Sequence, residues 1–213
     1  MKKINKKSLA SLVMISLFLG LVGPTSVLAL SPVSTPPLGV AASFGVLADT
    51  FTPIIATTSI SGDLGYTTLS SSGFHTLTGS TYIADSVYQE AGTDQNSALA
   101  ILNNQGPCTS LGANVVLAGT YTPGCYTSSG SMDIALGTTV TLSGAGTFLF
   151  RPGGALTTGA NAIVISTAGA SACDIFWTPG AATTLGANTA FLGTVIDASG
   201  ITIGDTVNWM VGL

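Results

Sequence analysis

Basic side chains are almost absent from this sequence beyond its first residues. The 213 residues include 5 Lys and Arg, and every Lys lies at or before Lys7, so Arg151 is the only basic residue after that point. Nine acidic residues against one Arg give a formal net charge of −8 for the chain after residue 29. Such a surface repels phosphate groups, so the composition argues against nucleic acid and anionic membranes as partners.

Residues that carry catalysis or hold metals are also scarce. His75 is the single histidine, the nine acids are scattered without a calcium-loop pattern, and the cysteines show no CxxC spacing. There is no Gly-x-Ser-x-Gly elbow and no phosphate-binding loop that ends in Lys. We therefore predict a protein that is not an enzyme and that has no metal site and no cofactor.

The N-terminus has the pattern of a secretory signal. Basic residues precede an apolar run from Leu9 to about Val22, and small residues lead to Ala29, which predicts a signal peptide over 1–29. A Pro/Ser/Thr linker over 30–37 follows, and one domain is expected over 38–213. We expect the protein to be secreted, with no membrane partner after cleavage, because no later apolar run is long enough to span a bilayer.

Three cysteines fit an oxidising compartment. Cys108 follows Gly106-Pro107 and Cys125 follows Pro123-Gly124, so both lie beside turn residues, which suits a local disulfide. Cys173 lies in an apolar segment and is predicted to be a buried thiol.

The spacing of apolar residues predicts one helix within a β-rich chain. Ala84, Val87, Ala91, Ala98 and Leu102 recur at helical intervals, so a helix is expected over about 83–103. Gly92 weakens the middle of this helix, and Gly106-Pro107 follows its end. On either side, short β-prone runs are separated by turn residues.

A short glycine motif returns along the second β-rich stretch. Its five copies are Leu111-Gly112-Ala113-Asn114, Leu136-Gly137-Thr138-Thr139, Thr158-Gly159-Ala160-Asn161, Leu185-Gly186-Ala187-Asn188 and Ile203-Gly204-Asp205-Thr206. The glycines of successive copies are 25, 22, 27 and 18 residues apart. A period near twenty residues with uneven spacing predicts an irregular β-solenoid, in which each coil buries its core only against its neighbours. Its inward residues are expected to include Val140, Leu142, Ile163, Ile165, Phe191 and Val195. A β-sandwich is the other possibility, and it is less favoured because hairpin signals are missing.

Thr and Asn gather at these repeats. Stacked coils would align them at about 4.8 Å along the solenoid and about 6.6 Å along a strand, which approximates oxygen repeats in ice. A rigid rank of threonines could order water, although Thr and Asn also suit the exposed strands of any secreted β protein. The candidate site residues are Thr138, Thr139, Thr157, Thr158, Asn161, Thr184, Asn188, Thr189, Thr202 and Thr206.

Several segments resemble, in the same order, the bacterial and fungal ice-binding family. They are Leu38-Gly39-Val40-Ala41-Ala42-Ser43-Phe44-Gly45-Val46-Leu47-Ala48, Ser61-Gly62-Asp63-Leu64-Gly65, Ala84-Asp85, Pro123-Gly124-Cys125-Tyr126 and Cys173-Asp174-Ile175-Phe176-Trp177. The resemblance implies a mainly β fold, a discontinuous right-handed β-solenoid with one long α-helix packed alongside. It also implies a secreted monomer that adsorbs to ice through a flat face and inhibits ice growth and recrystallisation.

The resemblance bears on three further features. Thr158-Gly159-Ala160-Asn161 fits the Thr-(Ala/Gly)-x-(Thr/Asn) motif of some members in full, whereas the other copies begin with Leu or Ile. The pair Cys108 and Cys125 resembles a disulfide of the family's capping loop. The segment Asn208–Leu213 departs from the family, which usually continues through a further strand, so the last coil is expected to be incomplete.

Two other functions remain open at this point. The same solenoid could be a spacer or a neutral-glycan-binding module of the cell envelope or of an adhesin. A polysaccharide lyase or hydrolase ranks third, because such enzymes commonly use basic residues or clustered carboxylates, whereas this sequence has one Arg, no Lys and only scattered acids after its signal.

Overall fold

The computed structural model describes residues 33–51, 58–69, 75–197 and 199–212. The chain divides into two units, Met1–Leu30 and Ser31–Leu213, and the description below concerns the second. The predicted signal peptide over 1–29 and residues 30–32 of the predicted linker lie outside the described residues.

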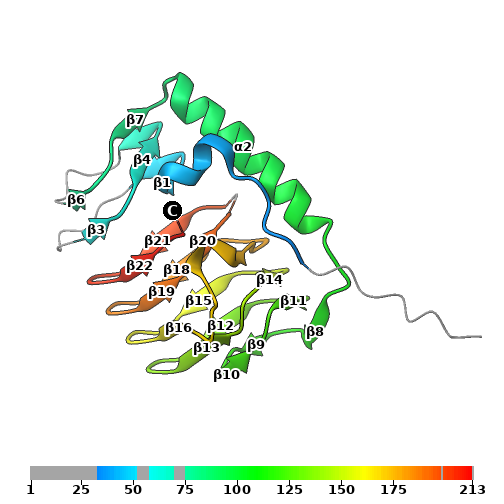
Figure 1. Ribbon diagram of the computed structural model, residues 1–213. Coiled ribbons are helices and arrows are strands. Elements are labelled where there is room, and N and C mark those ends of the chain that lie inside the picture. The colour runs from blue at the N-terminus through cyan, green and yellow to red at the C-terminus, as the bar shows by residue number, and fades with distance from the viewer. Residues whose placement is uncertain (1–32, 52–57, 70–74, 198, 213) are drawn as a thin grey trace, which may run out of the picture. The chain divides into compact units, whose positions relative to one another are not determined.

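Three parallel sheets, five strands each, make up most of the second unit (Figure 1). Sheet 1 consists of β8 (Thr109–Gly112), β11 (Gly124–Ser128), β14 (Phe148–Pro152), β17 (Ile175–Trp177) and β20 (Thr194–Val195). Sheet 2 consists of β9 (Val115–Val116), β12 (Met132–Ile134), β15 (Leu156–Thr158), β18 (Thr183–Leu185) and β21 (Ile201–Ile203). Sheet 3 consists of β10 (Gly119–Tyr121), β13 (Thr139–Ser143), β16 (Ile163–Thr167), β19 (Ala190–Leu192) and β22 (Asn208–Met210).

The strand order shows a solenoid. Each strand pairs in parallel with the strand three places later in the chain, as β12 does with β15 and β15 with β18. The chain therefore passes once through each sheet per coil, which confirms the predicted β-solenoid with its irregular coils.

The core runs between the three sheets and contains a stack of aromatic rings. The ring centroids of Tyr126 and Phe150 are 5.2 Å apart, and those of Phe150 and Trp177 are 4.3 Å apart. These rings occupy one register position on successive strands of sheet 1. Parallel stacking of coils thus places like residues on top of one another, where aromatic contacts add to the burial of apolar surface.

The predicted core is correct at four positions and wrong at two. Val140, Leu142, Phe191 and Val195 are buried, whereas 37% of Ile163 and 41% of Ile165 are exposed. The pairing of β13 with β16 aligns Val164 with the buried Val140, so Val164 points inward and its neighbours on either side point outward. The run Ile163–Ile165 is apolar at every position, so alternation along it cannot reveal which side faces the core.

One long helix, α2 (Ser86–Asn103), covers the outer side of sheet 1. The Asp85 carboxylate accepts a hydrogen bond of 2.9 Å from the Tyr88 backbone N–H, so Asp85 is the N-cap, and Gly92 does not interrupt the helix. Ala98 and Leu102 pack in one buried cluster with Leu149 and other side chains of sheet 1. No helix within the described residues is long and apolar enough to cross a membrane.

Arg151, the only basic residue after the predicted signal, caps the C-terminal end of α2. Its guanidinium donates hydrogen bonds to the carbonyl oxygens of Leu102, Asn103 and Gln105, at 3.1, 2.6 and 3.1 Å. The last carbonyls of a helix have no partner within the helix and carry partial negative charge, which a cation offsets. Arg151 therefore joins the end of α2 to sheet 1 and has a structural role.

Replacing Arg151 by Met is expected to lower the free energy of unfolding by about 1–2 kcal/mol, because helix-terminal carbonyls lose their donors while the apolar stem is kept. Urea denaturation measures this change. Arg151→Lys, which keeps the charge but not the forked donor, should be affected less. A Met variant as stable as the wild type would contradict this capping role.

The N-terminal part winds through its own short sheets. It begins with the 3-10 helix η1 (Gly39–Ser43) and precedes α2. Its strands are β1 (Phe44–Leu47), β2 (Thr50–Phe51), β3 (Thr58–Ile60), β4 (Asp63–Tyr66), β5 (Thr68–Leu69), β6 (His75–Leu77) and β7 (Thr81–Ile83). They pair in parallel as β1-β4-β7, β2-β5 and β3-β6. The helix thus separates two sets of coils along the sequence, as the β-prone runs on either side of the predicted helix indicate.

The predicted disulfide is present, and the prediction for the third cysteine is wrong. Cys108 and Cys125 are bonded, with their Cα atoms 4.5 Å apart. Cys173 is exposed, because it lies in the short 3-10 helix η2 (Ala172–Asp174) that precedes β17 and not in a strand that faces the core.

Candidate functional site

A row of threonines runs along the outer side of sheet 2. The pairing of β15 with β18 aligns Thr157 with Thr184, and the pairing of β18 with β21 aligns Thr184 with Thr202. The residues on either side of each threonine in its strand point inward, since side chains alternate along a strand. We call Thr157, Thr184 and Thr202 the threonine file; Thr157 is half-buried and the other two are exposed.

Small residues border the threonine file because the coils stack too closely for larger ones. A Cβ atom added to Gly159 would lie 2.5 Å from the backbone nitrogen of Leu136, and one added to Gly186 would lie 2.6 Å from the carbonyl oxygen of Thr158. The glycine beside Thr202, Gly204, is equally tight, at 2.8 Å from backbone atoms of the neighbouring coil. The surface beside the file is therefore low, and the threonine side chains stand above it.

The threonine file has the dimensions of a regular array. Neighbouring strands in a sheet lie about 4.8 Å apart, so methyl and hydroxyl groups repeat at that interval along the solenoid. Threonine is branched at Cβ and holds few rotamers, so these groups are kept in place without much loss of entropy on contact. The file can therefore present fixed hydroxyl and methyl groups to a flat, repeating surface.

At the β9 end of sheet 2, an acidic and an apolar side chain take the place of threonine and interrupt the array. Asp133 and Val116 occupy the positions that precede Thr157 in the same register. The Asp133 carboxylate accepts a hydrogen bond of 2.7 Å from the Ser131 hydroxyl. Among the described residues no cluster of three or more His, Cys, Asp or Glu could hold a metal ion.

A second row lies at the corner between sheets 2 and 3. Gly137, Asn161, Asn188 and Thr206 have positive φ angles of 63°, 58°, 58° and 53°. Backbone hydrogen bonds link them from coil to coil, as from Asn161 N to Ala187 O at 2.8 Å and from Asn188 N to Asp205 O at 2.8 Å. Asparagine is among the few side chains that tolerate this left-handed conformation, so turn geometry alone accounts for Asn161 and Asn188.

The register at this corner shows that the five motif copies are not all structurally equivalent. Three copies, which contain Gly159, Gly186 and Gly204, occupy the same corner. Gly137 stacks on Asn161 instead of on Gly159, since its backbone N–H bonds to the carbonyl oxygen of Ala160. Gly112 lies at the end of β8 in sheet 1. The copies of the glycine motif therefore occur in more than one kind of turn.

Two predicted site residues are buried, so their assignment to an exposed face is wrong. Only 2% of Thr158 and 1% of Thr189 are exposed. Their hydroxyl oxygens lie 3.1 Å apart, the Thr158 hydroxyl accepts a bond of 2.9 Å from Gly186 N, and the Thr189 hydroxyl donates one of 2.7 Å to Gly186 O. Thr158 takes an inward register position, and the two hydroxyls hold the turn backbone inside the solenoid.

Replacing Thr158 by Val is expected to lower the free energy of unfolding by about 1–2 kcal/mol, because a buried hydrogen-bond pair is lost at constant shape. Thr157→Val is the matched control: the same chemical change at the adjacent residue, which faces outward, should cost within about 0.5 kcal/mol. Thermal and urea unfolding measure both. Equal losses for the two variants would contradict the opposite orientations of these side chains.

The remaining predicted site residues are not brought together with the threonine file. Thr138 is half-buried and lies just before β13 of sheet 3, and Thr139 is exposed on β13. Thr206 is exposed at the corner, where its hydroxyl donates to the Asn188 side-chain oxygen. The ten predicted residues thus divide between sheet 2, the corner, sheet 3 and the core.

The sequence reasoning missed a further pair of threonines. Thr50 and Thr68 are aligned across β2 and β5, and both are exposed. Phe51, the residue after Thr50, is buried, so Thr50 points outward as the threonine file does. Each strand is only two residues long, a threonine followed by an apolar residue, so the sequence pattern was too short to predict the pair.

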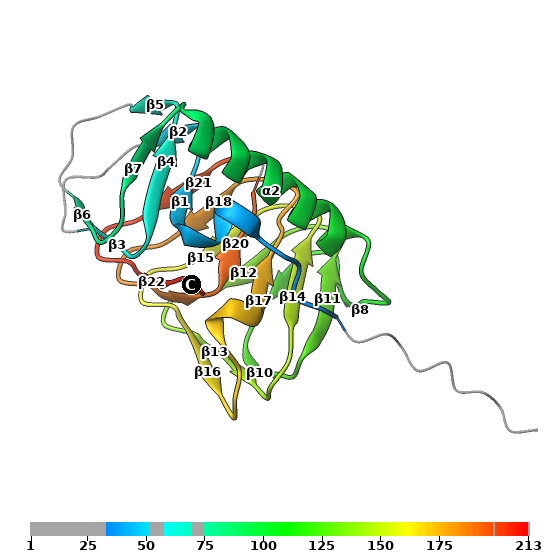
Figure 2. The ribbon, with the colours of Figure 1, turned by 45° about the horizontal axis from the view of Figure 1, so that its top comes forward.

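The other two faces are less suited to a flat polar array. Helix α2 covers sheet 1, as Figure 2 shows. Sheet 3 exposes Ile163, Ile165 and Met210, whose exposed fractions are 37%, 41% and 59%. Sheet 2 exposes Val116 at 63%, but this residue lies on the edge strand β9, outside the threonine file. Sheet 2 is therefore the candidate site.

This chain resembles known proteins in sequence and in fold. The family model described as ice-binding-like matches residues 46–212. A protein of Nostoc sp. (strain HG1) named "Ice-binding protein" is 30% identical over 179 residues, which are 80% of this chain and 65% of that protein. This chain thus spans a little under two thirds of the length of that relative.

Solved structures agree in fold. The ice-binding protein of the Antarctic ascomycete Antarctomyces psychrotrophicus has a TM-score of 0.71 at 26% identity, over 84% of this chain and 99% of that one. The ice-binding protein of an Antarctic Flavobacteriaceae bacterium has a TM-score of 0.72 at 26% identity, over 82% of this chain and 46% of that one. With a matching family model, parallel three-sheet coils and a long helix between two sets of coils, the chain belongs to the ice-binding-like family.

Proposed function

We propose that this protein binds ice through sheet 2 and thereby inhibits ice growth and recrystallisation. The observation that carries the proposal is the threonine file, in which Thr157, Thr184 and Thr202 stand in register above a border of small residues. The printed names of the relatives, which are ice-binding proteins, support it.

The physical basis is a match between fixed side chains and a crystal surface. Ordered methyl groups favour cage-like water around them, while the neighbouring hydroxyls hold that water in place, so the layer resembles ice before contact. Charged groups would hold water in other orientations, and the file itself carries none. Because the backbone and the β-branched side chains are already ordered, little conformational entropy is lost on adsorption.

The expected setting is extracellular and non-enzymatic. Cleavage after Ala29 would release a chain with one basic residue and nine acidic ones, which stays soluble through like-charge repulsion. Adsorption needs no cofactor and no turnover, and a monomer with one exposed array is sufficient for it.

The direct test uses the secreted form, residues 30–213, purified and checked for β structure by circular dichroism. Thermal hysteresis and the growth of ice grains during annealing are measured against an equal mass of serum albumin. Ice shaping, a freezing-point gap and smaller grains support the proposal. A folded sample that shows none of these at millimolar concentration overturns it.

A further inference from the structure

The two sulfur atoms of the disulfide lie in unlike surroundings. Cys108 is half-buried in the segment that joins α2 to β8, whereas Cys125 lies on β11 and only 4% of it is exposed. Solvent therefore reaches Cys108 more easily than Cys125. A thiol or disulfide that approaches the folded protein meets the Cys108 sulfur first.

The guanidinium of Arg151 contacts Cys108 as well as the end of α2. Its Nη2 atom lies 2.9 Å from Cys108 Sγ, while its Nη1 atom donates to the last carbonyl oxygens of the helix. The carbonyl oxygen of Gln105 lies 3.6 Å from the same sulfur, and Arg151 offsets its partial charge through a bond of 3.1 Å. Within the part of the chain that the structure describes, no carboxylate competes for this cation, and burial alone lowers the pKa of Arg151.

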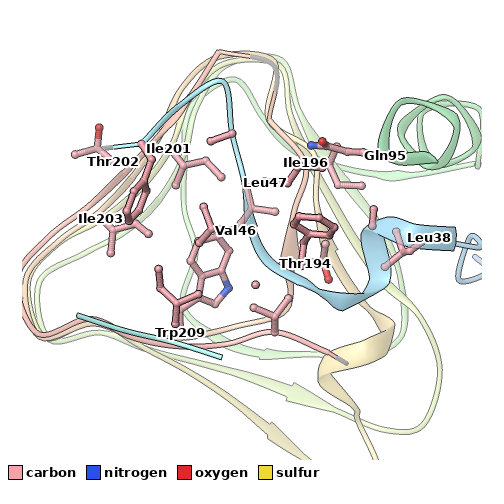
Figure 3. A pocket seen from close by; sticks show the side chains of 18 of the residues that line it. Leu38, Val46, Leu47, Gln95, Thr194, Ile196, Ile201, Thr202, Ile203 and Trp209 are labelled. Carbon is pink, nitrogen blue, oxygen red and sulfur yellow. The ribbon is translucent and has the colours of Figure 1, made fainter. Parts of the chain in front are cut away.

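Cys125, in contrast, lies in apolar surroundings. The pairing of β11 with β14 and of β14 with β17 aligns Cys125 with Leu149 and Phe176, and these side chains pack in one buried cluster under α2. Figure 3 shows Leu38 and Ile196, two further side chains of this cluster, beside the helix. An apolar site disfavours a charged sulfur, so Cys125 stays a protonated thiol when the disulfide is open.

Charge and access therefore favour the same sulfur. A cation in contact with a thiol stabilises its thiolate, and the thiolate is the form that attacks a disulfide. Cys108 has both the cation and the exposure, whereas Cys125 has neither. The hydrogen bonds from Arg151 to the end of α2 hold the guanidinium in place, so it need not move to reach a thiolate on Cys108.

We propose that Cys108 is the reactive sulfur of the reduced protein, where it forms a mixed disulfide with a small-molecule disulfide, RSSR, and that Arg151 positions and stabilises its thiolate. The Cys108 thiolate attacks one sulfur of RSSR, a bond to that sulfur forms, and RS⁻ leaves. The Cys125 thiol then loses its proton to water, its sulfur attacks Cys108 Sγ, and a second RS⁻ leaves. The two cysteines are oxidised to the disulfide, and RSSR is reduced to two thiols.

The first test locates the mixed disulfide. Residues 30–213 with Cys173→Ser are reduced, freed of reductant, mixed with oxidised glutathione and quenched with acid at intervals. Mass mapping of peptic peptides should find at least about tenfold more glutathione on Cys108 than on Cys125. In urea concentrated enough to unfold the chain, the two cysteines should react equally. Equal labelling in the folded protein, or glutathione mainly on Cys125, overturns the proposal.

The second test examines Arg151 through the pH dependence of alkylation. With Cys125→Ser and Cys173→Ser, the rate at which iodoacetamide modifies Cys108 should have its midpoint at or below about pH 7.5, against about 8.5 for an ordinary thiol. Arg151→Met should raise the midpoint to about 8.5 or higher, and Arg151→Lys, which keeps the charge, should restore it in part. A midpoint that does not change in a folded Arg151→Met protein overturns the assignment of Arg151.

The oxidised protein gives a third test that does not require the reduced chain to fold. Thiol–disulfide exchange is reversible, so reduced glutathione that opens the native disulfide must pass through the same mixed disulfide. After brief exposure to reduced glutathione and an acid quench, glutathione should be found on Cys108 and a thiol on Cys125. Glutathione on Cys125 with a thiol on Cys108 overturns the proposal.

Discussion

Replacing Thr184 by Tyr is expected to remove most of the ice-binding activity and to leave the fold intact. Thr184 is the middle member of the threonine file and is exposed. A phenol ring would stand well above Thr157 and Thr202 and hold a flat crystal surface away from both. If this costs about 1.4 kcal/mol of contact or more, the adsorption constant falls at least about tenfold. Thermal hysteresis and grain growth measure the loss.

The matched control for this variant is Thr139→Tyr. Thr139 is also exposed, but it lies on β13 of sheet 3, and the sequence placed it in the same candidate site. Both variants should change the free energy of unfolding by no more than about 0.5 kcal/mol, because both replace exposed side chains. If Thr139→Tyr lost the activity and Thr184→Tyr kept it, sheet 3 would be the binding face.

Removal of the disulfide should have the largest effect on stability. With Cys108→Ser and Cys125→Ser together, the free energy of unfolding is expected to fall by about 3 kcal/mol, the chain-entropy value for a loop of this size. The two residues are 17 positions apart, and their bond ties the segment after α2 to the second strand of sheet 1. The midpoint of thermal unfolding should fall by roughly 6–12 °C.

Cys173→Ser is the control for this prediction. Cys173 lies outside the disulfide and is exposed, so its replacement should leave the unfolding midpoint nearly unchanged. A reducing agent should destabilise the wild type and the Cys173→Ser protein equally and should not affect the double variant. A double variant that unfolds at the wild-type temperature would show that the bond adds nothing to the closed loop.

The periodicity of the sequence was sufficient for the helix and its boundaries within a few residues. Helical spacing predicted 83–103, and the helix spans Ser86–Asn103, starting later because β7 reaches Ile83 and Asp85 is the cap. Both the apolar spacing and the capping carboxylate are local, so the sequence around them contains the whole signal.

The candidate site was predictable only in part. Thr157, Thr184 and Thr202 were among the predicted residues and lie in one file, whereas Thr158 and Thr189 were predicted exposed and are buried. Thr157 and Thr158 are adjacent residues of the same type, but their side chains point to opposite sides of the strand. Residue type therefore could not show which of the two is exposed. The motif was also aligned by its letters, which placed Gly137 two positions away from its structural equivalent.

The sequence by itself determined the β-rich class, the stacked coils, the helix and the cysteine pair, because each depends on spacing over a few residues or on a repeat that is visible in the chain. The tertiary structure alone decided which side of each strand faces out and which sheet the helix covers. Those features depend on the register between coils many residues apart and on where α2 packs, and a one-residue change of register would exchange the inner and outer sides of a strand.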